Sequence, residues 1–318
     1  MIGANLTHRL VAEGYQVSVL LRPGTNRFRL EPVQHALDVH EADMTDAAAV
    51  QAAVIEVKPD VVFHLASTIW DKPPVASSAA HIEVNVLGTG HLLEALRAIP
   101  STRLVFTGSS AVYGAGSQLR ETQVPSPGTV YGASKAAATI LAQTYARLYG
   151  LQTVILHLFM VYGPWEHPSR LIPHTILSAL AGRDVPMTLG YQQRDLIYID
   201  DVVDALLLAA TKPVAPGSLF NIGSGVGVPV KDVVELLLGL MGNPVKPLLG
   251  AIPMRPDEIM TMSADITSAR TVLGWEPRTS LKEGLRKSIA WFTQHRNLAG
   301  QVAQGPRASA RTTVGASR

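Results

Sequence analysis

The chain alternates short apolar runs with longer segments in which apolar positions recur every three or four residues. Buried strands are predicted at 17–21, 60–65, 104–106 and 153–159. Amphipathic helices are predicted at 1–13, 85–98, 130–149, 230–241 and 281–292. This alternation predicts an α/β protein with a doubly wound parallel sheet, whose ligands bind at the carboxyl ends of the strands.

Composition narrows the class of protein. With 318 residues, 47% of them hydrophobic and 16% charged, the chain can bury one large core or two modest ones. A net charge of +2 argues against nucleic acid or an anionic membrane as partner. The absence of cysteine excludes disulfides and Cys-ligated metals, and no His, Asp and Glu cluster has metal-ligand spacing. Neither a membrane-length apolar run nor a signal peptide is found, which predicts a cytoplasmic protein.

The stretch 104–135 carries the most specific chemistry. Its apolar strand ends in a cluster of hydroxyl side chains, Thr107, Ser109 and Ser110. A loop rich in glycine and proline then leads into a helix that begins near Val130. The sequence therefore predicts a polar site where this strand meets this helix.

Tyr131 and Lys135 are four residues apart on that helix, so both side chains project from one face. An ammonium beside a phenol lowers the phenol's pKa, as a general acid/base near neutral pH requires. We predict that Tyr131 exchanges a proton with the substrate and that Ser109 holds the substrate oxygen. The same spacing also occurs by chance on solvated helix faces, but its position after a hydroxyl-tipped strand favours catalysis.

This segment resembles the active-site region of the extended short-chain dehydrogenase/reductase family. The family contains NAD(P)-dependent epimerases, dehydratases and reductases that act mostly on nucleotide sugars, and the resemblance runs from Met1 to about Phe292. It implies a Rossmann-like fold and a Ser109, Tyr131 and Lys135 catalytic group, in which Lys135 also holds the nicotinamide ribose. It further implies a homodimer formed through the helices at 85–98 and 130–149.

The resemblance also implies the cofactor site. Its residues would be Gly3, Arg22, Asp43, Met44, Leu65, Ala66, Ser67 and Thr107, together with Tyr131 and Lys135. Arg22 follows the strand at 17–21, where NAD-preferring relatives carry an acid, so NADP is slightly favoured over NAD. A solvated loop arginine is the alternative for Arg22.

The start of the chain departs from the family pattern. In relatives, a strand and a Gly-x-x-Gly-x-x-Gly turn precede the first helix, and only the last of these glycines, Gly3, is present. We therefore expect the sheet to lack a central strand and to leave the two neighbouring strands unpaired.

The same resemblance divides the chain into regions. The cofactor domain would comprise 1–163, with 194–225 returning to it, and a smaller α/β substrate lobe would comprise 164–193 and 226–296. A disordered tail would comprise 297–318, which lacks apolar periodicity.

The resemblance also implies that Ser110, Arg194 and Arg255 contact the substrate. Both arginines would bind the substrate's diphosphate. His157 and Met160 stand where the family has an arginine and an asparagine, so the diphosphate contact is weaker or the substrate differs. His64 is interpreted as a core histidine, Asp200 as the cap of the helix that follows it, and the Gly-rich turn at 221–225 as structural.

Several reactions stay open. Ser110 and Ala111 stand where 4,6-dehydratases have an Asp-Glu pair, which argues against dehydration. The sequence predicts a nucleotide-sugar epimerase or 4-ketoreductase. The alternatives are an inactive family member that serves as a binding or assembly module, and a reductase of a non-nucleotide ketone.

Overall fold

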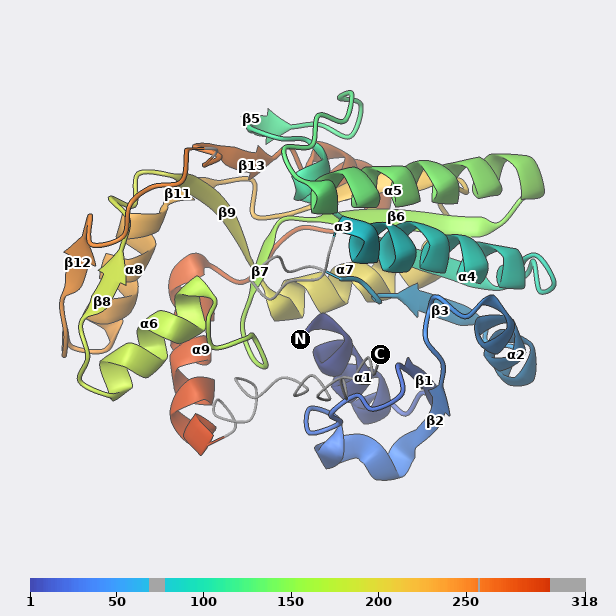
Figure 1. Cartoon of the computed structure of the whole chain (residues 1–318), viewed down its shortest axis with the longest axis horizontal. Coiled ribbons are helices and arrows are strands. Elements are labelled where there is room, and N and C mark those ends of the chain that lie inside the picture. Colours follow the sequence, from blue (N-terminus) through green and yellow to red (C-terminus); the bar gives the residue numbers. More distant parts are fainter. Residues whose placement is uncertain (69–77, 257, 298–318) are drawn as a thin grey trace, which may run out of the picture.

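A computed structural model of the chain describes residues 1–68, 78–256 and 258–297, so the predicted tail falls almost wholly outside the described residues. The largest sheet is parallel, and its strand order is β10-β6-β4-β3 (Figure 1). Its strands are β3 (Val61–His64), β4 (Arg103–Ser109), β6 (Gln152–Leu158) and β10 (Ser218–Ile222). The predicted α/β fold with a parallel sheet is confirmed.

Helices cover both faces of this sheet. One face packs against α2 (Ala47–Val57), α4 (Gly88–Leu96) and α5 (Val130–Tyr149). The side chains of Leu104 and Phe106 of β4 belong to the core on this face. The other face packs against α7 (Ile199–Thr211) and α1 (Ile2–Ala12), and the side chain of Val105 belongs to the core on that face. Successive β4 residues thus enter opposite cores, which is why this strand is apolar without alternation.

A separate pair of strands lies beyond β3. β1 (Val17–Leu21) and β2 (Leu37–Glu41) are parallel, in register from Val17 opposite Leu37, and together form a two-stranded sheet (Figure 1). Among the described residues no strand pairs with the second edge of β1 or with the second edge of β3. The expected gap in the sheet is confirmed, and its two neighbours are unpaired.

This gap corrects one expectation about β3. The segment 60–65 is predicted to be a fully buried strand, yet Val61, Val62 and Phe63 are only half-buried, and His64 alone is buried. A strand of a parallel sheet becomes fully buried only when neighbours occupy both of its edges as well as its faces.

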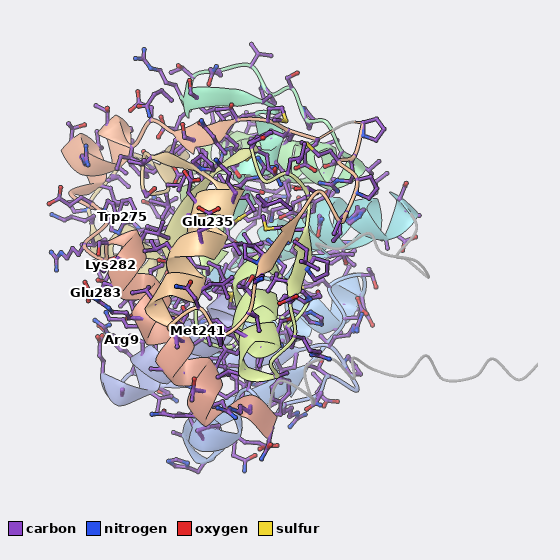
Figure 2. All side chains as sticks on the ribbon, turned by 90° about the vertical axis from the view of Figure 1, so that its left-hand side faces the viewer. Arg9, Glu235, Met241, Trp275, Lys282 and Glu283 are labelled. Atoms are coloured by element: carbon purple, nitrogen blue, oxygen red, sulfur yellow. The ribbon has the colours of Figure 1, made fainter. Side chains whose placement is uncertain are left out.

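A further part of the described chain forms three smaller sheets, whose strand orders are β11-β9-β7, β12-β8 and β13-β5. Its strands are β5 (Gly116–Leu119), β7 (Met160–Tyr162), β8 (Val185–Met187), β9 (Gln193–Tyr198), β11 (Gly227–Pro229), β12 (Pro247–Leu249) and β13 (Met262–Ala264). Its helices are α6 (Leu171–Leu180), α8 (Val230–Leu240) and α9 (Leu281–Gln294). Figure 2 shows α8 and α9 side by side, with Glu235 and Lys282 among the side chains on this end of the molecule.

Two helix starts differ from the sequence prediction. The helix expected from Asn85 begins earlier, as α3 (Ser78–His81), a π-helical segment (Ile82–Leu87) and then α4. Asp200 does not cap α7, because Tyr198 occupies that position and offers no side-chain cap; Asp200 lies in the first turn. Asp201 instead accepts the backbone N–H groups of Arg278 and Thr279 and joins α7 to the C-terminal segment.

Within the described ranges, no helix is both long enough and apolar enough to cross a membrane. The same part of the chain contains no group of His, Asp and Glu side chains arranged to hold a metal ion.

Candidate active site

The first turn of α5 is fixed against the loop after β4. Thr129 caps the helix by accepting the N–H of Gly132. A Cβ at Gly132 would lie 2.4 Å from the carbonyl oxygen of Ala111, so only glycine permits this close approach. The contact holds Tyr131 next to the end of β4, where Ser109 lies.

The Tyr131 hydroxyl lies near the hydroxyls of Ser109 and Ser67, which both act on its pKa. Ser109 comes from the end of β4, and Ser67 follows β3, so two adjacent strand ends and one helix converge on one phenol. Burial raises the pKa of Tyr131, while the two serine hydroxyls and the charge of Arg170 oppose the rise. The structure thus brings Ser109 and Tyr131 together as predicted.

Lys135 lies one turn further along α5 and is 3% exposed. Its Nζ lies 4.7 Å from the centre of the Phe106 ring, and burial lowers its pKa from 10.5 to about 7. The lowering of the Tyr131 pKa expected from Lys135 is not seen in this structure, where burial raises that pKa and the opposing groups are Ser109, Ser67 and Arg170. Its charge acts instead on two buried imidazoles.

Those imidazoles belong to His64 and His157, and each pKa is lowered from 6.5 to about 3, first by burial and then by Lys135. His64 bonds to Thr89 at 2.9 Å, which confirms it as a satisfied core histidine. His157 bonds to Thr139 at 3.1 Å and to the Tyr113 hydroxyl at 2.9 Å. Its ring packs on Gly108, where a Cβ would lie 2.1 Å away, so this imidazole supports the strand just before Ser109.

Asn85 is a residue of the site that the sequence reasoning did not single out. It is 1% exposed, and its amide donates to the Ser134 hydroxyl at 2.9 Å and to the Thr68 carbonyl at 3.1 Å. Its amide oxygen accepts from Ser67 and from the Thr68 backbone. Because Ser134 also donates to the Tyr131 carbonyl, Asn85 connects the end of β3 to the first turns of α5. A lone amide in an apolar helical stretch was the available signal.

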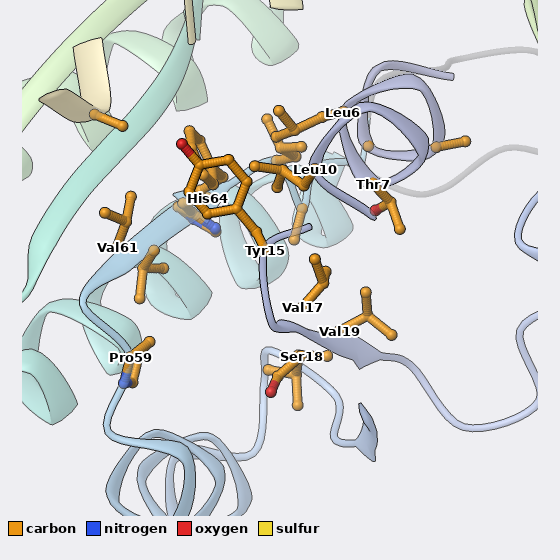
Figure 3. A pocket seen from close by; sticks show the side chains of 18 of the residues that line it. Leu6, Thr7, Leu10, Tyr15, Val17, Ser18, Val19, Pro59, Val61 and His64 are labelled. Carbon is orange, nitrogen blue, oxygen red and sulfur yellow. The ribbon is translucent and has the colours of Figure 1, made fainter. Parts of the chain in front are cut away.

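Seven of the predicted cofactor residues line one cavity of about 1710 Å³ (Figure 3), whereas Tyr131 and Lys135 are not part of its lining. Those that line it are Gly3, Arg22, Asp43, Met44, Leu65, Ala66 and Ser67. Thr107 lies deeper and donates its hydroxyl to the His64 carbonyl at 3.0 Å. Bonds from the backbone and side chain of Thr45 lower the pKa of Asp43, with a small contribution from Arg22. An ionised acceptor beside small and apolar strand ends fits the adenosine part of a dinucleotide.

The predicted substrate arginines share one carboxylate. Arg194 is an ion-pair partner of Glu258 and also donates to the Ile259 carbonyl at 2.6 Å, while Arg255 pairs with Glu258 at 3.0 Å. Glu258 was not singled out from the sequence, although it lies three residues after Arg255. Ser110 is buried beside Ser109, and Met160 lies in β7 at a small pocket that Arg170 also lines.

The Gly-rich turn at 221–225 is occupied by a protein side chain. The backbone N–H groups of Ser224 and Gly225 donate to the Asp195 carboxylate at 2.6 and 3.0 Å. Since these amides already have an anionic partner, the turn joins β10 to β9 as a structural element.

A sequence profile of the NAD dependent epimerase/dehydratase family matches residues 1–223. The chain belongs to this family. This epimerase/dehydratase family member is 32% identical over 308 residues to a UDP-glucose 4-epimerase of Mycolicibacterium smegmatis, across 92% of this chain and 95% of that protein. It is 30% identical to a dTDP-glucose 4,6-dehydratase of Neisseria meningitidis serogroup B, across 83% of this chain and 81% of that protein.

A solved relative agrees with the sequence matches. The UDP-glucose 4-epimerase of Thermus thermophilus, in complex with NAD, superposes with a TM-score of 0.83 at 28% identity, covering 93% of this chain and 96% of that one. The predicted resemblance, the Rossmann-like fold and the enzyme class are therefore confirmed. NAD is supported as the cofactor of this group, whereas the preference for NADP drawn from Arg22 finds no support.

Proposed function

We propose that this family member is an NAD-dependent nucleotide-sugar 4-epimerase whose catalytic group is Ser109, Tyr131 and Lys135. The observation that carries the proposal is the Tyr131 hydroxyl, which lies near the hydroxyls of Ser109 and of Ser67, a residue that lines the large cavity. A phenol beside two serine hydroxyls at adjacent strand ends is suited to act as a general acid/base.

NAD, when bound, would accept a hydride from the sugar carbon and return it to the same carbon. Asp43, Met44, Leu65, Ala66 and Ser67 would hold it along the cavity rim. Tyr131 would take the proton of the sugar hydroxyl as the carbon is oxidised, and would return that proton when the carbon is reduced. Ser109 would orient the sugar oxygen by hydrogen bonding.

Lys135 would support the proton transfer by its charge. In the structure its pKa is about 7, so at neutral pH it is poised between its two protonation states. An added negative charge nearby would favour the ammonium form, which in turn favours a phenolate on Tyr131. The coupling between these two residues would thus depend on the occupied site.

Arg194 and Arg255 would bind the substrate diphosphate. Two guanidinium groups that meet at one carboxylate can also meet at one diphosphate, whose oxygens accept the same planar donors. Glu258 would then be the group that holds them side by side. Ser110 would contact the sugar next to Ser109.

Epimerisation is preferred over dehydration because Ser110 and Ala111 offer no acid and no base after Ser109. Incubation of the purified protein with NAD and UDP-glucose or UDP-galactose, followed by anion-exchange chromatography, tests it. Interconversion of the two sugars supports the proposal. A 4-ketoreductase would give a different result. It would not interconvert the two sugars, but it would oxidise a reduced nicotinamide when a 4-keto-6-deoxy nucleotide sugar is added.

We also propose a homodimer through α4 and α5. These helices and the π-helical segment expose a set of large apolar side chains, namely Ile82, Leu87, Val130, Ile140, Leu148 and Tyr149. Burial of such a set against a second copy would remove it from water. Light scattering after size exclusion checks the mass, and Ile140→Glu is expected to shift it to that of a monomer.

A further inference from the structure

A series of hydrogen bonds runs through the buried imidazole of His157. We call it the His157 network; its members are Thr139, His157, Tyr113 and Asn221. His157 lies in β6, opposite Gly108 of β4 in the register of the sheet, and is 2% exposed. Its Nε2 lies 3.1 Å from the Thr139 hydroxyl, and its Nδ1 lies 2.9 Å from the Tyr113 hydroxyl. The other partners of the network decide which of these nitrogens carries a hydrogen.

The direction of the hydrogen bonds is fixed at Asn221. Its amide nitrogen donates to the Leu119 carbonyl at 2.8 Å, so its amide oxygen accepts the hydroxyl hydrogen of Tyr113 at 2.8 Å. A tyrosine hydroxyl has one hydrogen, so the Tyr113 oxygen accepts from Nδ1 of His157. In a neutral imidazole Nε2 then carries no hydrogen and accepts from the Thr139 hydroxyl. The network therefore fixes His157 as the Nδ1–H tautomer.

His64, the other buried imidazole on which the charge of Lys135 acts, is the opposite tautomer. The Thr89 hydroxyl donates to the Asn85 carbonyl at 2.7 Å, so its oxygen accepts from Nε2 of His64 at 2.9 Å. Burial, with a smaller contribution from Lys135, lowers the pKa of both imidazoles to about 3, so both are neutral at neutral pH. The two histidines differ in tautomer rather than in charge, and His64 provides an internal reference.

The ring of His157 supports the segment that carries Ser109 from both sides. A Cβ on Gly108, the residue before Ser109, would lie 2.1 Å from Cδ2 of the ring, so the imidazole fills the space that a side chain would occupy. Tyr113 follows the short 3-10 helix (Ser110–Val112) that begins directly after Ser109. The ring thus packs on the residue before Ser109 and bonds to the end of the turn after it.

The same ring is bonded to the helix that carries the other two catalytic residues. Tyr131, Lys135 and Thr139 follow one another at intervals of four residues in α5, so they lie on one face of that helix. The hydrogen bond from Thr139 therefore joins His157 to this face. Rotation of the ring would break its bonds to the helix and to the turn together.

We propose that His157 is a positioning residue for the catalytic group. Held as the neutral Nδ1–H tautomer by Thr139 and Tyr113, its ring sets the distance between the end of β4 and α5, and with it the approach of Ser109 to Tyr131. Both ring nitrogens are already bonded, so His157 acts through the residues that it holds and exchanges no proton. The inference rests on the proposed function, because positioning changes a rate only if Ser109 and Tyr131 are catalytic.

Nitrogen-15 NMR of the imidazoles tests the tautomer without an activity assay. The chain has 10 histidines, and the variants His157→Gln and His64→Gln assign the two signals of interest. We expect His157 to give the signals of a neutral Nδ1–H ring and His64 those of a neutral Nε2–H ring, from about pH 5.5 to about pH 8. An Nε2–H ring at His157, or its titration within that range, overturns the proposal.

Two substitutions each remove one partner of the ring and keep a side chain of similar shape. Tyr113→Phe removes the acceptor for Nδ1–H, and Thr139→Val removes the donor to Nε2. The matched control is Thr153→Val, also in β6. It makes the same change at a buried threonine whose hydroxyl has no hydrogen-bond partner within the described residues. Only the first two substitutions should loosen the ring.

Hydrogen exchange followed by mass spectrometry measures the positioning itself. We expect Tyr113→Phe and Thr139→Val to speed amide exchange about tenfold in 104–113 and in the first turns of α5. Thr153→Val should leave both segments unchanged. Equal exchange in the three variants overturns the proposal. No substrate is present, so this result and the tautomer decide the role of His157 even if the chain does not interconvert sugars, an outcome that would count against the proposed function alone.

Kinetics with NAD and UDP-glucose distinguish positioning from a purely structural role. Tyr113→Phe and Thr139→Val should each lower kcat about tenfold and change KM less than about twofold, because a misaligned catalytic group slows the reaction while substrate binding is kept. Thr153→Val should keep the kcat of the unaltered chain. If both variants of the network have a kcat within about twofold of this control in an active enzyme, His157 has no positioning role.

Discussion

The parallel strands fall into two groups of similar composition but different surroundings. We call β4 and β6, with the helices on them, the complete half of the sheet, and β1 and β3, which border the gap, the incomplete half. β4 and β6 each have a strand on both sides and helices on both faces, and their interior residues are buried without exception. β1 and β3 are equally apolar, but each has one free edge, and most of their residues are only half-buried. An apolar run is thus enough to form a strand, whereas a core requires neighbours on every side.

The difference extends to the chemistry of the site. Ser109, Tyr131 and Lys135 lie on the complete half of the sheet, where Thr129, Gly132 and the buried imidazole of His157 support their positions. Most of the residues that would hold the cofactor line the large cavity beside β1 and β3. Catalytic geometry and cofactor affinity should therefore respond to different substitutions.

The largest effect is expected from Tyr131→Phe in the complete half. Loss of the proton-transferring hydroxyl should lower kcat for sugar interconversion by about 10²–10⁴. NAD affinity should change little, because the ring stays in place, and fluorescence titration checks this. Tyr149→Phe, at an exposed position of the same helix, is the control and should keep full activity. Equal activity of Tyr131→Phe and the control would refute the assigned role.

Lys135→Met should raise the free energy of unfolding and at the same time abolish enzymatic activity. Burial lowers the Lys135 pKa to about 7, so unfolding takes up a proton between pH 7 and 10.5, and stability of the native chain rises with pH in that window. The variant lacks this penalty, so we expect it to be more stable by roughly 2–4 kcal/mol at pH 7 and to lose activity. Its advantage should shrink as the pH approaches 10.5, as urea unfolding at several pH values would show.

The control for this variant is Lys282→Met, which changes an exposed lysine of α9. Its stability should stay within about 0.5 kcal/mol of the unaltered chain at each pH. A stability gain in Lys135→Met that does not vary with pH would mean that packing, rather than the buried charge, sets the difference.

A matched pair of valines compares the two halves of the sheet directly. Val154→Ala in β6, where Val154 is 1% exposed, should lower the free energy of unfolding by about 2 kcal/mol. Val19 in β1 is half-buried and lines the large cavity, so Val19→Ala should cost less than about 1 kcal/mol. Denaturant unfolding measures both. Equal costs would show that the free edge of β1 is covered in solution.

Glu166→Gln extends the comparison to a buried carboxyl that lies outside both halves of the sheet. One carboxylate oxygen of Glu166 is buried without a partner, and burial raises its pKa from 4.5 to about 8. The native carboxyl is thus protonated where the unfolded one is ionised, so stability falls as the pH rises from 4.5 to 8. The amide should recover roughly 2–4 kcal/mol at pH 8 and nothing at pH 4.5. Glu235→Gln, at an exposed site of α8, should show no such pH dependence.

The local pattern predicted most elements correctly. The helices α1, α5, α8 and α9, and the strands β1, β4 and β6, begin and end within a few residues of their expected positions. Two predictions about helix starts were wrong. The helical region expected from Asn85 begins at Ser78 and continues through His81, and Tyr198 rather than Asp200 occupies the capping position of α7. The juxtaposition of Ser109 with Tyr131 followed from motif spacing, because a strand end and the next helix start are neighbours in this topology.

The sequence by itself determined the α/β order, the hydroxyl-tipped strand, the Tyr131 and Lys135 spacing and the incomplete glycine turn, since each depends on residues close together in the chain. Only the tertiary structure decided that the Lys135 charge acts on His64 and His157, that Asn85 joins two parts of the site, and that Glu258 holds both arginines. It also decided that β1 and β3 line one large cavity. These features arise from residues far apart in the chain, whose distances and burial follow from packing rather than from local periodicity.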